Sequence, residues 1–125
     1  MGLRLYLDAA CTQEVTATNP DAVHKAVVSG VDMTDERSLW IKSDDVALTY
    51  ENIVLTSQGD DAQVDVKYAA DNNGAPGTYA DSLSLPNGDF AAAVRVWRKV
   101  TAPNVTATFK RTNINHSLTW DEYVI

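Results

Sequence analysis

The chain has 125 residues, one cysteine, 45% apolar and 22% charged residues, and a net charge of −7. This length can bury a core of its own, and the composition argues against disorder and against a fibrous repeat. No apolar run approaches the roughly 18 residues of a spanning helix, and MGLRLYLDAA is too short and too quickly acidic for a signal peptide. This length predicts one domain over residues 1–125. The lone cysteine excludes an internal disulfide, so we expect the chain to fold in a reducing cytoplasm.

Alternating apolar and polar residues, the pattern of a half-buried strand, recur along the chain between turn residues. In order, they predict strands at residues 2–7, 25–29, 38–42, 46–56, 64–68, 82–85, 90–103, 105–110 and 114–124. Residues 25–29 have an alternative interpretation, because Asn19 could cap a helix that has Pro20 in its first turn and runs to Gly30. A Val-Val pair and the lack of an amphipathic stripe favour the strand.

Two strands contain a change of register. In residues 46–56 the apolar positions shift at Glu51 and Asn52, which predicts a bulge or a strand that crosses between sheets. Residues 90–103 form the predicted central strand, with Phe90 and the valines on its even face. Trp97 then lies on the opposite face, unless a bulge near Arg98 shifts the register.

The connections are also readable. Residues 71–78, DNNGAPGT, form the richest cluster of Gly, Pro and Asn and predict the most exposed loop. Residues 86–88 predict a tight, hairpin-type connection into the central strand. With no convincing helix and no crossover units, the chain is predicted to be all-β, an antiparallel β-sandwich of about eight strands.

Charge divides the chain unevenly. Residues 1–90 carry five basic and fifteen acidic side chains, and residues 91–125 carry five basic and two acidic ones. The basic residues of this last part are Arg95, Arg98, Lys99, Lys110 and Arg111. They could meet an acidic partner surface, whereas the acidic remainder should repel nucleic acid. The alternative is that they are ordinary solvated residues of an outer face.

Few residues suggest chemistry. His24, His116 and Cys11 are the side chains that titrate near neutrality, and no nucleophile-elbow, zinc-protease or phosphate-loop motif accompanies them. His116 lies on the apolar face of the last strand, where a hydrogen-bonded core or interface histidine is the commoner interpretation. Asp71 and Asn73 begin like a calcium loop, but its closing ligands are missing. We therefore expect no enzyme activity, metal or cofactor.

Four segments resemble small structural proteins of tailed bacteriophages, the kind encoded beside capsid or tail genes. They are LRLYLDAACTQEVT, LWIKSDDVALTYENI, VDVKYAADNNGAPGTY and VWRKVTAPNVTATFKRT. The resemblance implies an immunoglobulin-like sandwich and a virion component of the head-decoration type. It supplies no functional residue, since these are packing and turn patterns.

The resulting expectation is a non-enzymatic capsid decoration, or cement, protein. It would be made in the host cytoplasm, reside in the virion as a homo-oligomer, and bind the major capsid protein or another virion protein, without nucleic acid or membrane. The predicted partner-binding residues are Arg95, Trp97, Arg98, Lys99, Lys110 and Arg111, with Trp97 as an apolar anchor. The alternative is a carbohydrate-binding module of a tail or fibre, with exposed aromatic residues near residues 71–78.

Overall fold

The computed structural model describes residues 2–16, 18–25, 31–57, 64–105 and 109–125. Within them the chain forms strands and no helix. The strands are β1 Leu3–Tyr6, β2 Asp21–Lys25, β3 Val31–Ser43, β4 Leu48–Ser57, β5 Asp65–Asn72, β6 Ala75–Pro76, β7 Ser82–Leu85, β8 Val94–Val105, β9 Phe109–Ile114 and β10 His116–Val124.

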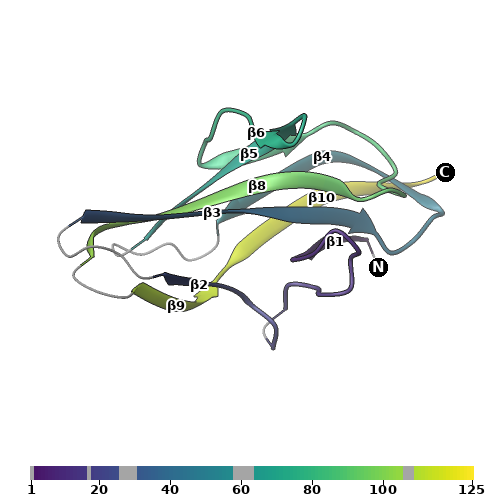
Figure 1. Cartoon of the computed structure of the whole chain (residues 1–125). Helices are drawn as coiled ribbons and strands as arrows, with labels where there is room; N and C mark the ends of the chain where they lie inside the picture. Colours follow the sequence, from purple (N-terminus) through teal and green to yellow (C-terminus); the bar gives the residue numbers. More distant parts are fainter. Residues whose placement is uncertain (1, 17, 26–30, 58–63, 106–108) are drawn as a thin grey trace.

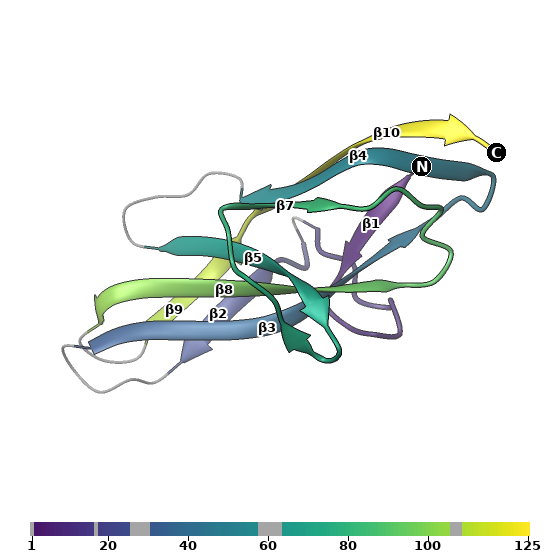
Figure 2. The same ribbon diagram turned by 90° about the horizontal axis from the view of Figure 1, so that it is seen from above.

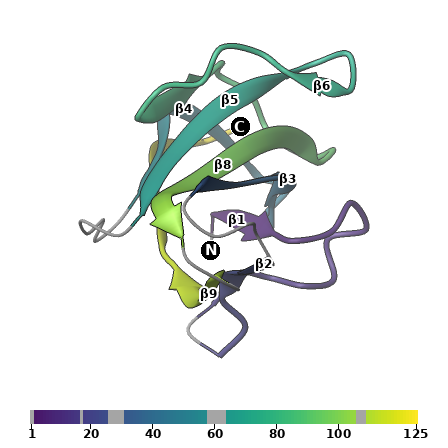
Figure 3. The ribbon, with the colours of Figure 1, turned by 60° about the vertical axis from the view of Figure 1, so that its left-hand side comes forward.

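The strands form two layers that face each other. One is a sheet in the order β1-β3-β8-β5-β6, and the other contains a sheet in the order β10-β4-β7 (Figures 1 and 2). A two-stranded ribbon of β2 and β9 continues from the start of β10, since only Asn115 separates β9 from β10. Figure 3 shows this ribbon below β3, on the side away from β5 and β6. The pairings are antiparallel, so the predicted all-β antiparallel sandwich is confirmed.

Alternate residues of the two layers fill the core, as the pleat of a strand requires. Leu39 and Val96, from β3 and β8, are fully buried, and Tyr50 and Leu55 of β4 face them from the other layer. Burying a large apolar side chain contributes about 1.5–3 kcal/mol, so these rows supply the main stabilisation of the sandwich.

The predicted register change in β4 is confirmed as a bulge. Its pairing with β10 shifts by one residue between Thr119 and Asp121, opposite Asn52. Asn52 has a φ of 52°, in the left-handed region that Asn tolerates better than most residues. The bulge lets Tyr50 and Ile53 both point into the core, and β4 stays in one sheet.

The central strand is confirmed in place but not in its bounds. β8 lies in the middle of the larger sheet, yet it begins at Val94 rather than at Phe90. Phe90 is buried ahead of the strand at a φ of 54°, and its carbonyl accepts a hydrogen bond from the Ser43 amide. The pairing of β8 with β3 runs without a shift from Val94 to Ala102, so the alternative of a bulge near Arg98 is wrong.

Other bounds differ from the predicted ones. β2 occupies Asp21–Lys25, so the alternative of a helix that begins at Asn19 is wrong. Residues 26–30, which include most of the predicted strand 25–29, lie outside the described part. β3 is thirteen residues long and extends well before the predicted strand 38–42. The exposed loop predicted at 71–78 contains a hairpin whose turn is Asn73-Gly74, both at positive φ. Residues 86–88 are not a hairpin connection, because β7 pairs with β4 and not with β8.

Candidate functional site

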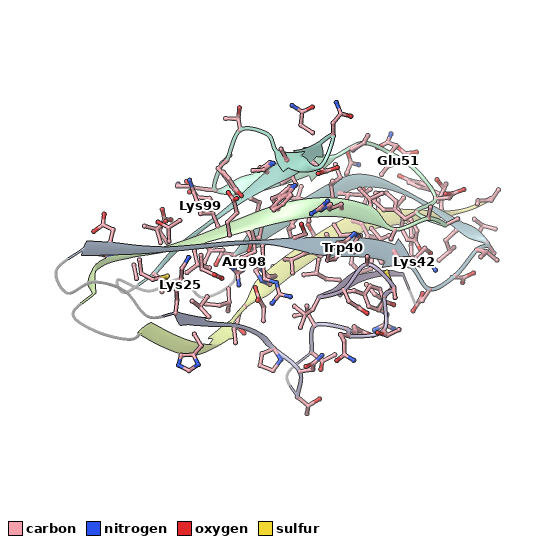
Figure 4. All side chains as sticks on the ribbon, viewed as in Figure 1. Lys25, Trp40, Lys42, Glu51, Arg98 and Lys99 are labelled. Carbon is pink, nitrogen blue, oxygen red and sulfur yellow. The ribbon has the colours of Figure 1, made fainter. Side chains whose placement is uncertain are left out.

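The central strand β8 presents two chemically different faces. Arg95, Trp97 and Lys99 point away from the core, as predicted, whereas Arg98 is on the same side as Val96 and Val100. In Figure 4, Lys99 and Arg98 are labelled on opposite sides of the β8 ribbon. The regular two-residue alternation of a strand produces this separation.

Arg98 is therefore not a partner-binding residue, and that prediction is wrong. Its side chain is 0% exposed and lies between the two layers. Nε and Nη2 donate to the two carboxylate oxygens of Asp21 at 2.8 and 2.9 Å. Nη1 donates to Asp35 Oδ2 at 2.7 Å and to the Asp35 carbonyl at 3.0 Å, and Nη2 also reaches the Ala22 carbonyl at 3.4 Å. The guanidinium is thus fully engaged inside the protein.

The buried arginine belongs to a polar row that crosses the larger sheet. Arg37 of β3 and Tyr68 of β5 are its direct neighbours in the pairing, one on each side. Like charges opposite each other destabilise a sheet, and here the carboxylate of Asp21 separates them. Asp21 is fully buried, and Arg37 Nη1 approaches its Oδ1 at 3.3 Å.

His116 joins this row from the opposite layer. Its side chain is 1% exposed, with Nε2 at 2.8 Å from Asp21 Oδ2 and Nδ1 at 2.5 Å from the Tyr68 hydroxyl. Since an ionised carboxylate only accepts hydrogen bonds, Nε2 must carry a proton. In the neutral ring, Nδ1 then accepts from Tyr68. The predicted hydrogen-bonded core histidine is confirmed.

Asp21 is ionised because of its partners. Burial would raise the pKa of this carboxyl, but the hydrogen bonds from His116 and Arg98 outweigh it and hold the pKa well below its usual value. The pKa of Arg98 is raised, because its bonds to Asp21 and Asp35 outweigh burial, which would lower it. Asp21 and Arg98 are buried, and the partly exposed Arg37 and Asp35 complete a charged group of two arginines and two carboxylates.

This charged group links β8 of the larger sheet to β2 and to β10 of the other layer, and neither ring nitrogen of its histidine is free. Both ring nitrogens of His116 are bonded to Asp21 and Tyr68, so the ring does not activate Cys11. Burial raises the pKa of the Cys11 thiol, which opposes formation of a thiolate. Cys11 is a free, partly exposed cysteine.

The outer face of β8 carries a stacked arginine. The Arg95 guanidinium lies 4.5 Å from the ring centroid of Trp97 and 5.6 Å from that of Trp40 on β3. Its Nε donates to Ser38 Oγ at 2.7 Å, and Trp97 Nε1 donates to Asp71 Oδ1 at 2.9 Å. The arginine is thus fixed between two indoles on the central strands of the larger sheet, and we call Trp40, Arg95 and Trp97 the outer stack.

A second contact of the same kind lies beside the outer stack. Lys99 Nζ is 4.6 Å from the ring centroid of Tyr79, whose hydroxyl donates to Glu36 Oε2 at 2.6 Å. Burial and this bond to Glu36 raise the pKa of Tyr79 above its ordinary value. Lys99 and Glu36 are direct neighbours in the β3–β8 pairing. The outer face is therefore a mixture of cations, carboxylates and aromatic rings.

Two predicted site residues, Lys110 and Arg111, lie on β9 and not on the outer face of β8. The backbones of Lys110 and Arg111 pair with His24 and Val23 in the β2–β9 ribbon, and their side chains lie outside the described part. The partner-binding residues predicted from the sequence do not include Trp40, Ser38 or Tyr79. Trp40 had a signal, because it lies between the core residues Leu39 and Ile41 and so must point outward.

Two other surface features lie away from β8. A pocket of about 210 Å³ opens between β1 and β10, and its lining consists of Leu3, Arg4, Leu5, Glu14, Val15, His116, Leu118 and Trp120. The exposed large apolar side chains of the described part gather near the end of the β4–β10 pair, at Val46, Tyr123, Val124 and Ile125.

The residues described by the structure contain no group of three or more His, Cys, Asp or Glu side chains arranged to hold a metal ion. They contain no helix long and apolar enough to cross a membrane. No family model matches this sequence, and comparisons with curated proteins and with solved structures find no significant match.

Proposed function

We propose that this chain is a non-enzymatic structural protein of a virion, a decoration protein that binds the outer surface of a capsid as a symmetric oligomer. The four segments that resemble phage structural proteins support the virion assignment. The observation that carries the binding role is the outer stack, a preformed group of two tryptophans and an arginine on the central strands.

The composition of the outer stack supports docking to a protein. Tryptophan and arginine are enriched at interface positions that dominate binding energy. Trp40 and Trp97 are already held by Arg95, so little further ordering would be needed on binding. The buried charged group below them makes the sheet a firm support for such a face.

The carbohydrate-binding alternative receives less support. Stacking of a sugar needs an open aromatic face. Tyr68 is fully buried, one face of Trp97 carries the Arg95 guanidinium, and the Tyr79 ring carries Lys99. Near the 71–78 segment, Tyr68 is thus inaccessible to a sugar, and Trp97 and Tyr79 are each contacted by a cation of the same chain.

The test is occupancy on purified particles of the source virus that lack this protein. A variant with Arg95→Gln and Trp97→Ala should lose at least about thirtyfold in affinity, since even one hot-spot truncation costs about 2 kcal/mol or more. Val46→Ser is the matched control, because Val46 is 85% exposed and lies in the apolar group at the end of the β4–β10 pair, away from the outer stack. Equal occupancy of the double variant and the wild type, or loss with Val46→Ser alone, would refute the proposal.

A further inference from the structure

Arg95 differs from the other arginines whose side chains the structure describes. Arg4, Arg37 and Arg98 each form an ion pair with a carboxylate. Arg95 has none within the described part: its Nε is bonded to Ser38, and the rings of Trp40 and Trp97 flank its guanidinium. Its two terminal amino groups therefore remain available for a partner.

The surroundings of Arg95 prepare it for a directed contact. A guanidinium presents its donors in a planar fork that matches the two oxygens of a carboxylate. On most surfaces the flexibility of the arginine side chain offsets the gain from such a pair. Here Ser38 fixes Nε at 2.7 Å and the indoles hold the plane, so much of that flexibility is already lost.

We propose that Arg95 is a receptor for a carboxylate of the partner protein, an Asp or Glu side chain that the fork binds between Trp40 and Trp97. This inference rests on the proposed function and specifies the chemistry that the partner must present. An apolar group beside that carboxylate would contact the exposed parts of the indoles. The stack thereby selects an acidic residue with an apolar neighbour.

Nearby charges favour a carboxylate over a phosphate. Asp71 accepts a hydrogen bond from Trp97, and Glu36 accepts one from Tyr79 on the same face. These carboxylates, with the net charge of −7, repel a dianion more strongly than a monoanion. A partner that carries single negative charges therefore fits better than a phosphorylated one.

The test is NMR titration of the full chain with N-acetyl-glutamate amide, monitored at the indole N–H of Trp97. We expect a saturable shift with a dissociation constant in the millimolar range, weakened at least fivefold by Arg95→Lys, which keeps the charge and loses the fork. Lys25→Gln, which removes an exposed cation of β2 away from the outer stack, should leave the shift unchanged.

Several results would overturn the inference: an equal shift with N-acetyl-glutamine amide, tighter binding of inorganic phosphate, or no effect of Arg95→Lys. The particle-occupancy experiment keeps the two proposals apart. If the carboxylate probe does not bind while the double variant still loses occupancy, Arg95 is not a carboxylate receptor, but the outer stack still binds the particle. If the probe binds and the wild type does not occupy particles, the carboxylate site stands and the virion role is wrong.

Discussion

Replacing Asp21 by Asn should remove a large part of the stability of the sandwich. Its carboxylate accepts from Arg98 at two atoms, from Arg37 and from His116, at distances of 2.8 to 3.3 Å. An amide has one accepting oxygen, and its NH₂ would face the donors of Arg98. Removing one partner of a buried ion pair costs about 3–5 kcal/mol, because the other charge stays buried.

Urea unfolding measures this loss. At an m-value of about 2 kcal/mol/M, a loss of about 4 kcal/mol lowers the unfolding midpoint by about 2 M. Asp35→Asn is the matched control, since the Asp35 side chain is 29% exposed and binds Arg98 at one amino group. We expect it to cost about 1–2 kcal/mol. A loss below about 1 kcal/mol for Asp21→Asn would show that the buried charges do not hold the layers together.

The pH dependence has a defined direction. The folded pKa of Asp21 lies below its unfolded value of about 3.9, so its stabilisation is present above that pH and is lost as the pH falls through the folded pKa. The stability difference between wild type and Asp21→Asn should therefore be constant above about pH 5 and shrink below about pH 4. A difference that stays constant down to pH 2 would contradict the assignment of an ionised Asp21.

Two further local features are tested by the same unfolding measurement. Tyr68→Phe removes the hydroxyl at His116 Nδ1 and should cost about 1–3 kcal/mol, and an unchanged midpoint would contradict that hydrogen bond. Gly2→Ala puts a Cβ about 2.5 Å from Trp120 Cζ2 at a φ of +143°, whereas Gly74→Ala meets no atom within 4 Å at a φ of +89°. Gly2→Ala should destabilise clearly more than Gly74→Ala, which carries only backbone strain of about 1–3 kcal/mol. Equal losses of stability would show that the Trp120 side chain moves aside at no cost.

The architecture could be predicted because alternation is a local signal. The 3.3 Å rise and two-residue repeat of a strand make Val96 and Val100 face the core whatever their partners are. The bulge at Asn52 was readable for the same reason, since the apolar register changes there. The first half of β3 was missed, because Asp35 and Arg37 occupy inward positions that a pattern search expects to be apolar.

The site was only partly predictable, since its geometry depends on contacts distant in sequence. Arg98 occupies an even position among valines, and that position alone indicated the core face. Its carboxylate partner, Asp21, is 77 residues away, and nothing local indicates that pairing. The stacking of Arg95 between Trp40 and Trp97 likewise requires the register of β3 against β8.

Hydroxyl-radical footprinting of the three tryptophans, in the free protein and in the particle-bound protein, tests most directly whether the outer stack contacts the particle. We expect oxidation of Trp40 and Trp97 to fall several-fold on binding. Trp120, which lines the pocket between β1 and β10, should be oxidised at the same rate in both states. Protection of Trp120 with unchanged oxidation of Trp40 and Trp97 would show that the outer stack does not contact the particle and would place the interface at the pocket between β1 and β10.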